Sequence, residues 1–231
     1  MKLLALDTSS LACSVALQVD DEVSWRHEEQ AREHTRILLP MIEEVLAEAG
    51  VQVADLDGIV LGNGPGSFIG MRIATSVAQG LAHGAGLGIV PVSSMLAVAA
   101  QVIADEGAKA VAVCQDAHMN EVYLGLYAAG CDRVPDLVGA ERIHDLSVIV
   151  ELELESGRFV AAGLGWQRYP GLLGTNKPFL AGVSGISYPA ARYLLVAGRA
   201  LAESGATVDP QEVVPAYLRQ TVARPSPPRG S

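Results

Sequence analysis

Apolar runs and alternating segments at the start of the chain predict three strands. Lys2–Leu6 is a continuous apolar run that ends at Asp7, which is typical of a buried strand leading into a polar turn. Cys13–Val19 alternates apolar and small residues, and Val23–Glu28 returns after an acidic turn. The last two segments therefore predict a hairpin.

An apolar stripe at intervals of three and four residues predicts a helix over residues 33–49. Pro40 lies within it, lacks an amide hydrogen and clashes with the preceding turn. The helix therefore either starts near Leu39 or bends at the proline, and Gly50 is a typical stop. The stripe consists of Ile37, Leu38, Met41, Ile42, Val45, Leu46 and Ala49.

Strands and helices alternate in the next segment, so the predicted order of the first half is β-β-β-α-β-α-β-α. Serines cap the last helix of this half. The segments are Gly58–Leu61 (strand), Ser67 or Gly70 to His83 (helix, ended by Gly84, Gly86 and Gly88), Ile89–Val92 (strand) and Ser93 or Ser94 to Asp105 (helix).

The pattern restarts after Glu106-Gly107, which predicts an α/β fold of two subdomains over residues 1–106 and 107–223. Residues 224–231 are rich in Arg, Pro and Ser and predict a flexible tail. The predicted elements of the second half are strands at Ala110–Gln115, Glu121–Tyr127, Val134–Val138 and Phe159–Ala162, and helices at Asp145–Glu155 and Tyr188–Ser204.

Composition narrows the class of protein. Half of the 231 residues are apolar and 18% are charged, so the chain can bury a sizeable core and is not disordered as a whole. Sixteen Lys and Arg against 26 Asp and Glu give a net charge of −10, which argues against a stand-alone nucleic-acid binder. Three cysteines without C-x-x-C spacing, no signal peptide and no membrane-length apolar run predict a soluble cytoplasmic protein.

Each half begins with a strand that ends in an aspartate, Asp7 or Asp116. Two duplicated β-β-β-α units with such aspartates resemble the actin-like nucleotide-binding architecture. There the carboxylates hold a metal ion and turn amides hold phosphates across a cleft. A turn-forming or capping role for each aspartate is the alternative.

A glycine loop lies between a predicted strand and helix and consists of Gly62, Gly64, Gly66, Ser67 and Gly70. Its glycines allow close backbone approach, and the following helix presents amides that bind anions. A tight turn with close helix packing is the alternative. The loop lacks both the Gly-Lys-Ser/Thr of a Walker loop and the spacing of a dinucleotide fingerprint.

Residues for metal-dependent or nucleophilic catalysis are mostly missing from the sequence. The five histidines form no H-x-x-x-H pair, and the chain has no G-x-S-x-G elbow. His118, beside Asp116, is the histidine nearest to the predicted cleft.

Five blocks in this order resemble the TsaB (YeaZ) family of tRNA threonylcarbamoyladenosine biosynthesis proteins. The resemblance covers nearly the whole chain and implies an actin-like, ribonuclease H-like duplicated β-β-β-α-β-α fold. The blocks are Leu4–Ser9 with Cys13–Leu17, Arg32–Thr35 with Leu39-Pro40, Gly62–Ile73, Asp116–Tyr123 and Pro215–Arg219.

The resemblance also implies a function beside the paralogue TsaD and the ATPase TsaE. TsaD attaches threonylcarbamoyl to N6 of the adenosine next to the anticodon in ANN-decoding tRNAs, and the TsaB-type chain is its non-catalytic dimer partner. TsaD-type proteins carry H-x-x-x-H on the helix after Val92, where this chain has Ser94 and Val98. Neither side chain replaces an imidazole ligand. No protease site is evident either.

By resemblance, helices 33–49 and 67–83 form the surface for TsaD and, in the isolated chain, for a homodimer. No cofactor is required, ATP or ADP can bind at an interface of the complex, and tRNA is contacted indirectly. The expected interface residues are His34, Ile37, Leu38, Met41, Ile42, Val45, Phe68, Met71, Arg72 and Thr75, and the expected nucleotide-cleft residues are Asp7, Thr8, Ser9 and Asp116.

Two departures from the family pattern argue against nucleotide binding in the cleft of this chain. Ile69 stands where the family has Thr, and His118 stands where it has Arg. An actin-like ATPase or small-molecule kinase, motivated by the aspartates and the glycine loop, and a purely homodimeric interaction module remain as alternatives.

Overall fold

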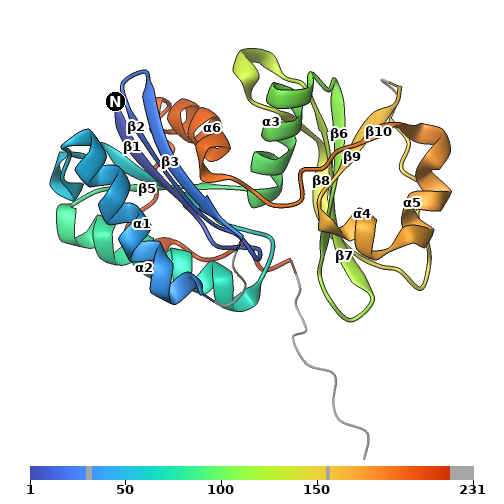
Figure 1. Ribbon diagram of the computed structural model, residues 1–231, viewed down its shortest axis with the longest axis horizontal. Helices are drawn as coiled ribbons and strands as arrows, with labels where there is room; N and C mark the ends of the chain where they lie inside the picture. The colour runs from blue at the N-terminus through green and yellow to red at the C-terminus, as the bar shows by residue number, and fades with distance from the viewer. Residues whose placement is uncertain (30–32, 155–156, 219–231) are drawn as a thin grey trace, which may run out of the picture.

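A computed structural model describes residues 1–29, 33–154 and 157–218 of the chain. It contains two five-stranded sheets, shown side by side in Figure 1. The first sheet has the order β3-β2-β1-β4-β5 and the second β10-β9-β6-β7-β8. The strands are β1 Lys2–Asp7, β2 Cys13–Val19, β3 Glu22–Glu28, β4 Gly58–Gly62, β5 Ile89–Val92, β6 Ala110–Asp116, β7 Glu121–Ala128, β8 Asp136–Asp145, β9 Phe159–Ala162 and β10 Leu180–Val183.

Both sheets have the same topology, which confirms the predicted duplicated fold. In each, the first three strands pair antiparallel and the last two continue in parallel with the first. Asp7 and Asp116 are the last residues of β1 and β6, so they occupy equivalent positions in the two sheets. The actin-like architecture therefore follows from the pairing of the strands.

Helices cover both faces of both sheets (Figure 1). α1 and α2 pack on one face of the first sheet and α6 on the other, while α3 packs on the second sheet and against α6, and α4 packs on the opposite face. α3 belongs to the first half of the chain but packs on the second sheet, and α6 belongs to the second half but packs on the first sheet. The domain boundary at residue 106 stays a prediction. The helices are α1 His34–Ala49, α2 Phe68–Ala85, α3 Ser94–Glu106, α4 Leu164–Arg168, α5 Pro170–Asn176 and α6 Ala191–Glu203, with 3-10 turns η1 Val53–Asp55, η2 Cys131–Arg133, η3 Lys177–Phe179 and η4 Pro210–Glu212.

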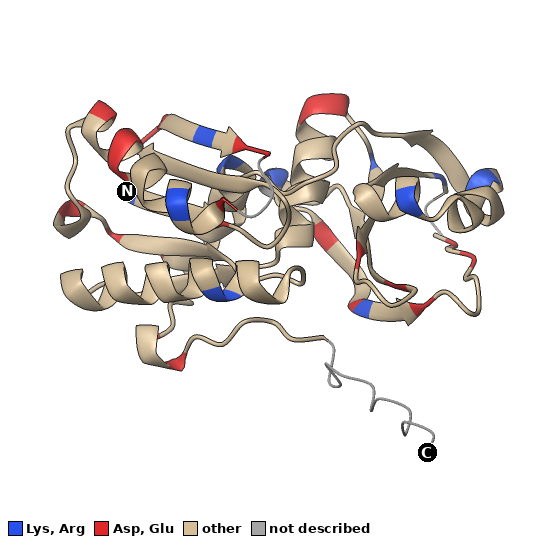
Figure 2. Ribbon diagram, turned by 60° about the horizontal axis from the view of Figure 1, so that its bottom comes forward, with Lys and Arg blue, Asp and Glu red and all other residues tan. Residues whose placement is uncertain are grey.

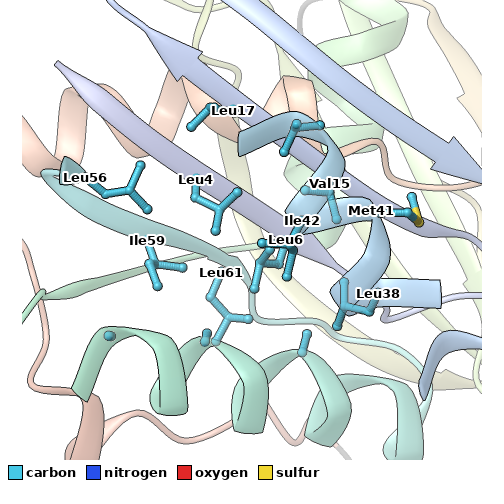
Figure 3. Close-up of a cluster of buried hydrophobic side chains, with 14 of the residues drawn as sticks. Leu4, Leu6, Val15, Leu17, Leu38, Met41, Ile42, Leu56, Ile59 and Leu61 are labelled. Carbon is cyan, nitrogen blue, oxygen red and sulfur yellow. The ribbon is translucent and has the colours of Figure 1, made fainter. Parts of the chain in front are cut away.

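The core beneath α1 shows why this helix forms despite its proline. Leu38, Met41 and Ile42 lie among apolar side chains of the strands, including Leu4 and Leu6 of β1 (Figure 3). Burying each such side chain contributes about 1.5–3 kcal/mol, which together exceeds the roughly 3 kcal/mol cost of an interior proline.

The helix α1 starts at His34 and continues through Pro40, so the alternative start near Leu39 is wrong. Pro40 is exposed, so water can reach the carbonyl that the proline leaves without an amide partner. Gly50 ends the helix as predicted, with a left-handed φ of 64°.

The predicted end of the next helix is wrong by about half a turn. α2 runs through Gly84 to Ala85, and Gly86 is the residue that adopts the left-handed conformation, with φ 68°. Its start agrees with the capping serine, because Ser67 Oγ accepts the Gly70 amide at 3.2 Å.

The predicted helix Asp145–Glu155 is wrong. β8 runs to Asp145, and the described residues after it are irregular. Leu152 and Leu154 alternate with glutamates and pack in the core, which is the period of an extended segment. The Leu152 amide donates to the buried Asn176 Oδ1 at 2.7 Å, and Asn176 Nδ2 donates to Val150 O at 2.9 Å. The segment is therefore fixed by the Asn176 side chain.

Two further boundaries differ from the sequence prediction. β8 replaces the predicted strand Val134–Val138 and is longer, because an exposed edge strand shows no apolar alternation. α6 begins at Ala191 instead of Tyr188, because the residue before Pro189 disfavours helical angles. None of the described helices is long and apolar enough to cross a membrane.

Candidate functional site

Asp7, the first of the strand-end aspartates, is enclosed by protein. Its side chain is 0% exposed. The Ser9 amide and hydroxyl each donate to Oδ1 at 2.8 Å, and Ser94 Oγ donates to Oδ2 at 2.6 Å. A Cβ on Gly62 would lie 2.0 Å from Asp7 Oδ2, so this position requires glycine. Both carboxylate oxygens therefore face protein groups.

Burial raises the pKa of the Asp7 carboxyl above its ordinary value of 3.8, and hydrogen bonds from Ser94 and Ser9 offset part of the rise. Ser94 Oγ also accepts the Gly64 amide at 3.0 Å. These bonds join β1, the glycine loop and the start of α3. Asp7 thus links these three elements inside the protein.

The glycine loop packs on the turn between β1 and β2. A Cβ on Gly66 would lie 2.1 Å from Ser9 O, and one on Gly70 would lie 1.9 Å from Thr8 O. The Ser67 amide donates to Ser9 O at 2.6 Å, and Thr8 Oγ1 donates to Gly70 O at 2.6 Å. The geometry matches the tight turn with close helix packing, because the Ser67 and Gly70 amides both bind protein oxygens.

Asp116, the second strand-end aspartate, is surrounded by donors. His118 N and Tyr169 OH donate to Oδ1 at 3.0 and 2.7 Å, and Arg168 Nη1 lies 3.0 Å from Oδ2. His118 Nδ1 lies 3.1 Å from Oδ2. Burial and the Asp116 charge raise the pKa of Tyr169. The carboxylate is therefore already paired with a cation and two further polar side chains.

Two cavities lie beside these residues. A cleft of about 810 Å³ lies between the β1–β2 turn and glycine loop on one side and the end of β6 on the other. Ser9 and Asp116 line it, whereas Asp7 and Thr8 do not. A groove of about 510 Å³ lies between α1 and α2 and is lined by both helices. The structure thus brings only part of the expected cleft set to a common cavity.

Most of the expected partner residues are in the core of this chain, which corrects the expected surface. The 3–4 period selects the stripe that a helix turns toward its own sheet. Ile37 is half-buried, and only Phe68 and Arg72 are exposed. The buried members of the set are His34, Leu38, Met41, Ile42, Val45, Met71 and Thr75.

Two exposed apolar residues of the α1–α2 face are missing from the expected set. Leu39 is 47% and Ile69 70% exposed, and both line the groove with Thr35. The sequence signal for both is an apolar residue outside the buried stripe. Leu39 directly follows Leu38, and Ile69 lies in the first turn of α2. Arg72 is the only Lys, Arg, Asp or Glu in α2, the long and almost uncharged helix in Figure 2.

The two positions that match the metal-ligand pair of TsaD-type proteins are internal. Ser94 is bonded to Asp7 and Gly64, and Val98 packs in the core between α3 and the second sheet. Among the described residues, no group of three or more His, Cys, Asp and Glu side chains could hold a metal ion. The predicted tail 224–231 and Arg219 lie outside the described residues.

Glycine 70 tests whether the loop is packed as described. Gly70→Ala should lower the free energy of unfolding by about 2–3 kcal/mol, because the new Cβ meets a backbone oxygen. Gly80→Ala is the matched control, since Gly80 lies in the same helix with nothing within 4 Å of the new Cβ. It should raise the free energy of unfolding by about 0.5–1 kcal/mol. Urea unfolding measures both, and equal effects would contradict the packing.

The burial of Asp7 predicts a sign for the pH dependence of stability. Because its pKa is higher in the native state, native Asp7 binds a proton more tightly than in the unfolded chain. Its contribution is fully present below pH 3.8 and is lost as the pH rises through the native pKa. The free energy of unfolding of the wild type minus that of Asp7→Asn should therefore fall from pH 4 toward neutrality. A difference that rises with pH would show the opposite shift.

Comparisons with known proteins agree with the family resemblance of the sequence motifs. A sequence model of TsaD, described as tRNA N6-adenosine threonylcarbamoyltransferase, matches residues 27–165. The chain is 35% identical to the tRNA threonylcarbamoyladenosine biosynthesis protein TsaB of Escherichia coli K12, with 96% of each chain covered. The Haemophilus influenzae TsaB is also 35% identical, over 96% of this chain and 95% of the relative.

A solved structure is similar over the same extent. YeaZ from Pseudomonas aeruginosa superposes with a TM-score of 0.87 and 34% identity, covering 94% of this chain and 99% of that one. Sequence and structure therefore agree over nearly the full length of both. The chain belongs to the TsaB (YeaZ) family of tRNA threonylcarbamoyladenosine biosynthesis proteins.

Proposed function

We propose that this chain is a non-catalytic activating subunit that dimerises with TsaD during synthesis of threonylcarbamoyladenosine. The modification lies at N6 of the adenosine next to the anticodon in ANN-decoding tRNAs. Membership in the TsaB family supports a role in this biosynthesis, because the relatives carry its name. Dimerisation with TsaD and its activation go beyond what the names of the relatives say and are our proposal.

The observation that carries the proposal is that the side chains of Ser94 and Val98 are enclosed within the protein. By resemblance, TsaD-type chains hold the catalytic metal with two histidines at these places. Here the Ser94 hydroxyl is bonded to Asp7 and to the Gly64 amide, and Val98 is buried. A hydroxyl so engaged and an isopropyl group provide no metal ligand. The chain therefore depends on another subunit for transfer chemistry.

A magnesium nucleotide, which the actin-like fold implies, does not fit the residues of the cleft. Asp7 has no exposed atom surface and takes three protein hydrogen bonds. Asp116 is paired with Arg168, and the glycine loop is packed on Ser9. These contacts count against the ATPase or kinase alternative. We expect ATP or ADP to bind, if at all, at an interface of the complex.

The α1–α2 groove supports a surface for a helical partner. Leu39 and Ile69 are exposed on facing helices, and α2 carries a single charged side chain. Exposed apolar side chains that line a groove between two helices favour protein association. We expect TsaD to dock here, a second copy to take its place in the isolated chain, and TsaE and tRNA to be contacted through the complex. The net charge of −10 fits indirect contact with tRNA.

Ile69→Glu and Leu39→Glu test this surface. Each places a carboxylate in an apolar contact and should weaken TsaD binding by about 2 kcal/mol, or roughly 30-fold in Kd. Val148→Glu is the matched control, because Val148 is also 70% exposed and lines neither cavity. Titration calorimetry and light scattering measure the Kd and the size of the complex.

Equal affinity of all three variants would contradict the surface, and absence of binding by the wild type would contradict the partner. Met41 and Ile42 are unsuitable targets because both are core residues beneath α1. Charged substitutions there would report unfolding of the chain instead of loss of the interface.

A further inference from the structure

Exposed apolar side chains gather around the cleft as well as on the α1–α2 face. They come from the β1–β2 turn, both helices, the β6–β7 turn and the C-terminal segment. A contiguous group of this kind marks an interaction site, whereas scattered ones are ordinary. The group consists of Leu11, Leu39, Phe68, Ile69, Met119 and Tyr217, and each lines the cleft or the groove.

The cleft and the groove share part of their lining. His34 and Thr35 at the start of α1, with Ile69 and Ile73 of α2, line both cavities. The first turns of the two helices therefore form a common wall. A protein that binds across α1 and α2 would therefore lie against residues that also line the cleft.

The charges of the cleft do not fit an anionic ligand. Arg168 Nη1 lies 3.0 Å from Asp116 Oδ2, so the charge of the guanidinium is opposed within the site. At the groove, the Arg72 guanidinium lies 3.7 Å from the centre of the Phe68 ring and donates to Tyr217 OH at 3.0 Å. An uncharged occupant would not be repelled by the Asp116 carboxylate and would not need an ion pair with Arg168 or Arg72.

The walls fit apolar side chains of variable shape. Met119, which is 53% exposed, lines the cleft, and the tilted rings of Phe68 and Tyr217 lie with their centres 5.6 Å apart. Methionine side chains adapt to the shape of an apolar partner. Because the cleft shares these lining residues with the groove, the occupant best placed to enter it is a segment of the protein docked on α1 and α2.

We propose that the cleft is a second part of the docking surface and receives an uncharged, apolar segment of the transferase subunit bound on α1 and α2. The proposal rests on the proposed function. The partner then contacts both subdomains, since Leu11 precedes β2 of the first sheet and Met119 lies between β6 and β7 of the second. Binding fixes the placement of one subdomain relative to the other.

Met119→Glu tests the cleft without touching either helix. It should weaken the Kd for the transferase at least 10-fold. Val183→Glu is the matched control, because Val183 is 54% exposed and Met119 53%, and Val183 lines neither cavity. The control should bind within twofold of the wild type. Calorimetry gives the Kd, and thermal unfolding shows that both variants are folded.

Thiol labelling keeps the test valid if the charged variant does not fold. Met119→Cys is made with Cys131→Ser, since Cys13 and Cys114 are buried and burial raises the pKa of Cys13 to about 12. Its maleimide labelling rate should fall at least 10-fold in the complex. Val183→Cys in the same background should label at an unchanged rate.

The outcomes separate this proposal from the proposed function. If Ile69→Glu weakens binding while both Met119 variants behave as the wild type, the cleft proposal is overturned and the helix surface stands. If the wild type does not bind the transferase, both fail. If magnesium ATP alone protects Met119→Cys in the isolated chain, a nucleotide occupies the cleft and the proposal is overturned.

Discussion

A buried carboxylate holds the centre of this molecule together. Asp7 receives three hydrogen bonds from Ser9 and Ser94, and Ser94 in turn accepts the Gly64 amide. An unpaired charge in this position would cost several kcal/mol, so the donors must stay in place whenever Asp7 is ionised. The end of β1, the glycine loop and the first turn of α3 therefore have one relative arrangement.

That arrangement decides what the cleft can do. The glycine loop lies so close to the β1–β2 turn that side chains at Gly66 and Gly70 would overlap with backbone oxygens. Features that would serve a phosphate group are used here for packing. Ser94, at a metal-ligand position of the paralogue by resemblance, belongs to the same network. Under the proposed function, the same network keeps Asp7 and Ser94 from binding a ligand and fixes the glycine loop, so the surface available to a partner is the apolar one.

The regular elements follow from the sequence where the apolar period is undisturbed. The bounds of β2, β5 and β9 are those that the pattern predicts, because buried strands are continuous or strictly alternating. The pattern fails at residues 145–154, where the conformation depends on hydrogen bonds to Asn176, a residue more than twenty positions away. α4, α5 and β10 are short, and no period predicts them.

The site follows from the sequence only in part. Asp7 and the glycine loop are recognisable, but whether they bind a ligand or each other depends on distances below 3 Å that a pattern does not contain. The helical stripe reports the buried face of α1, so it selects Met41 and Ile42 instead of Leu39. Ile69 stands where the family has Thr, and because its side chain is exposed, this difference changes the surface of the protein.

The central claim is that the chain activates a partner through its surface and supplies no reacting group. The direct measurement is the threonylcarbamoyl transfer rate of TsaD as a function of the concentration of this chain, for the wild type and Ile69→Ala. The account predicts that the concentration for half-maximal activation rises by the same factor as the Kd, while the maximal rate is unchanged. A lower maximal rate at full assembly would contradict the account.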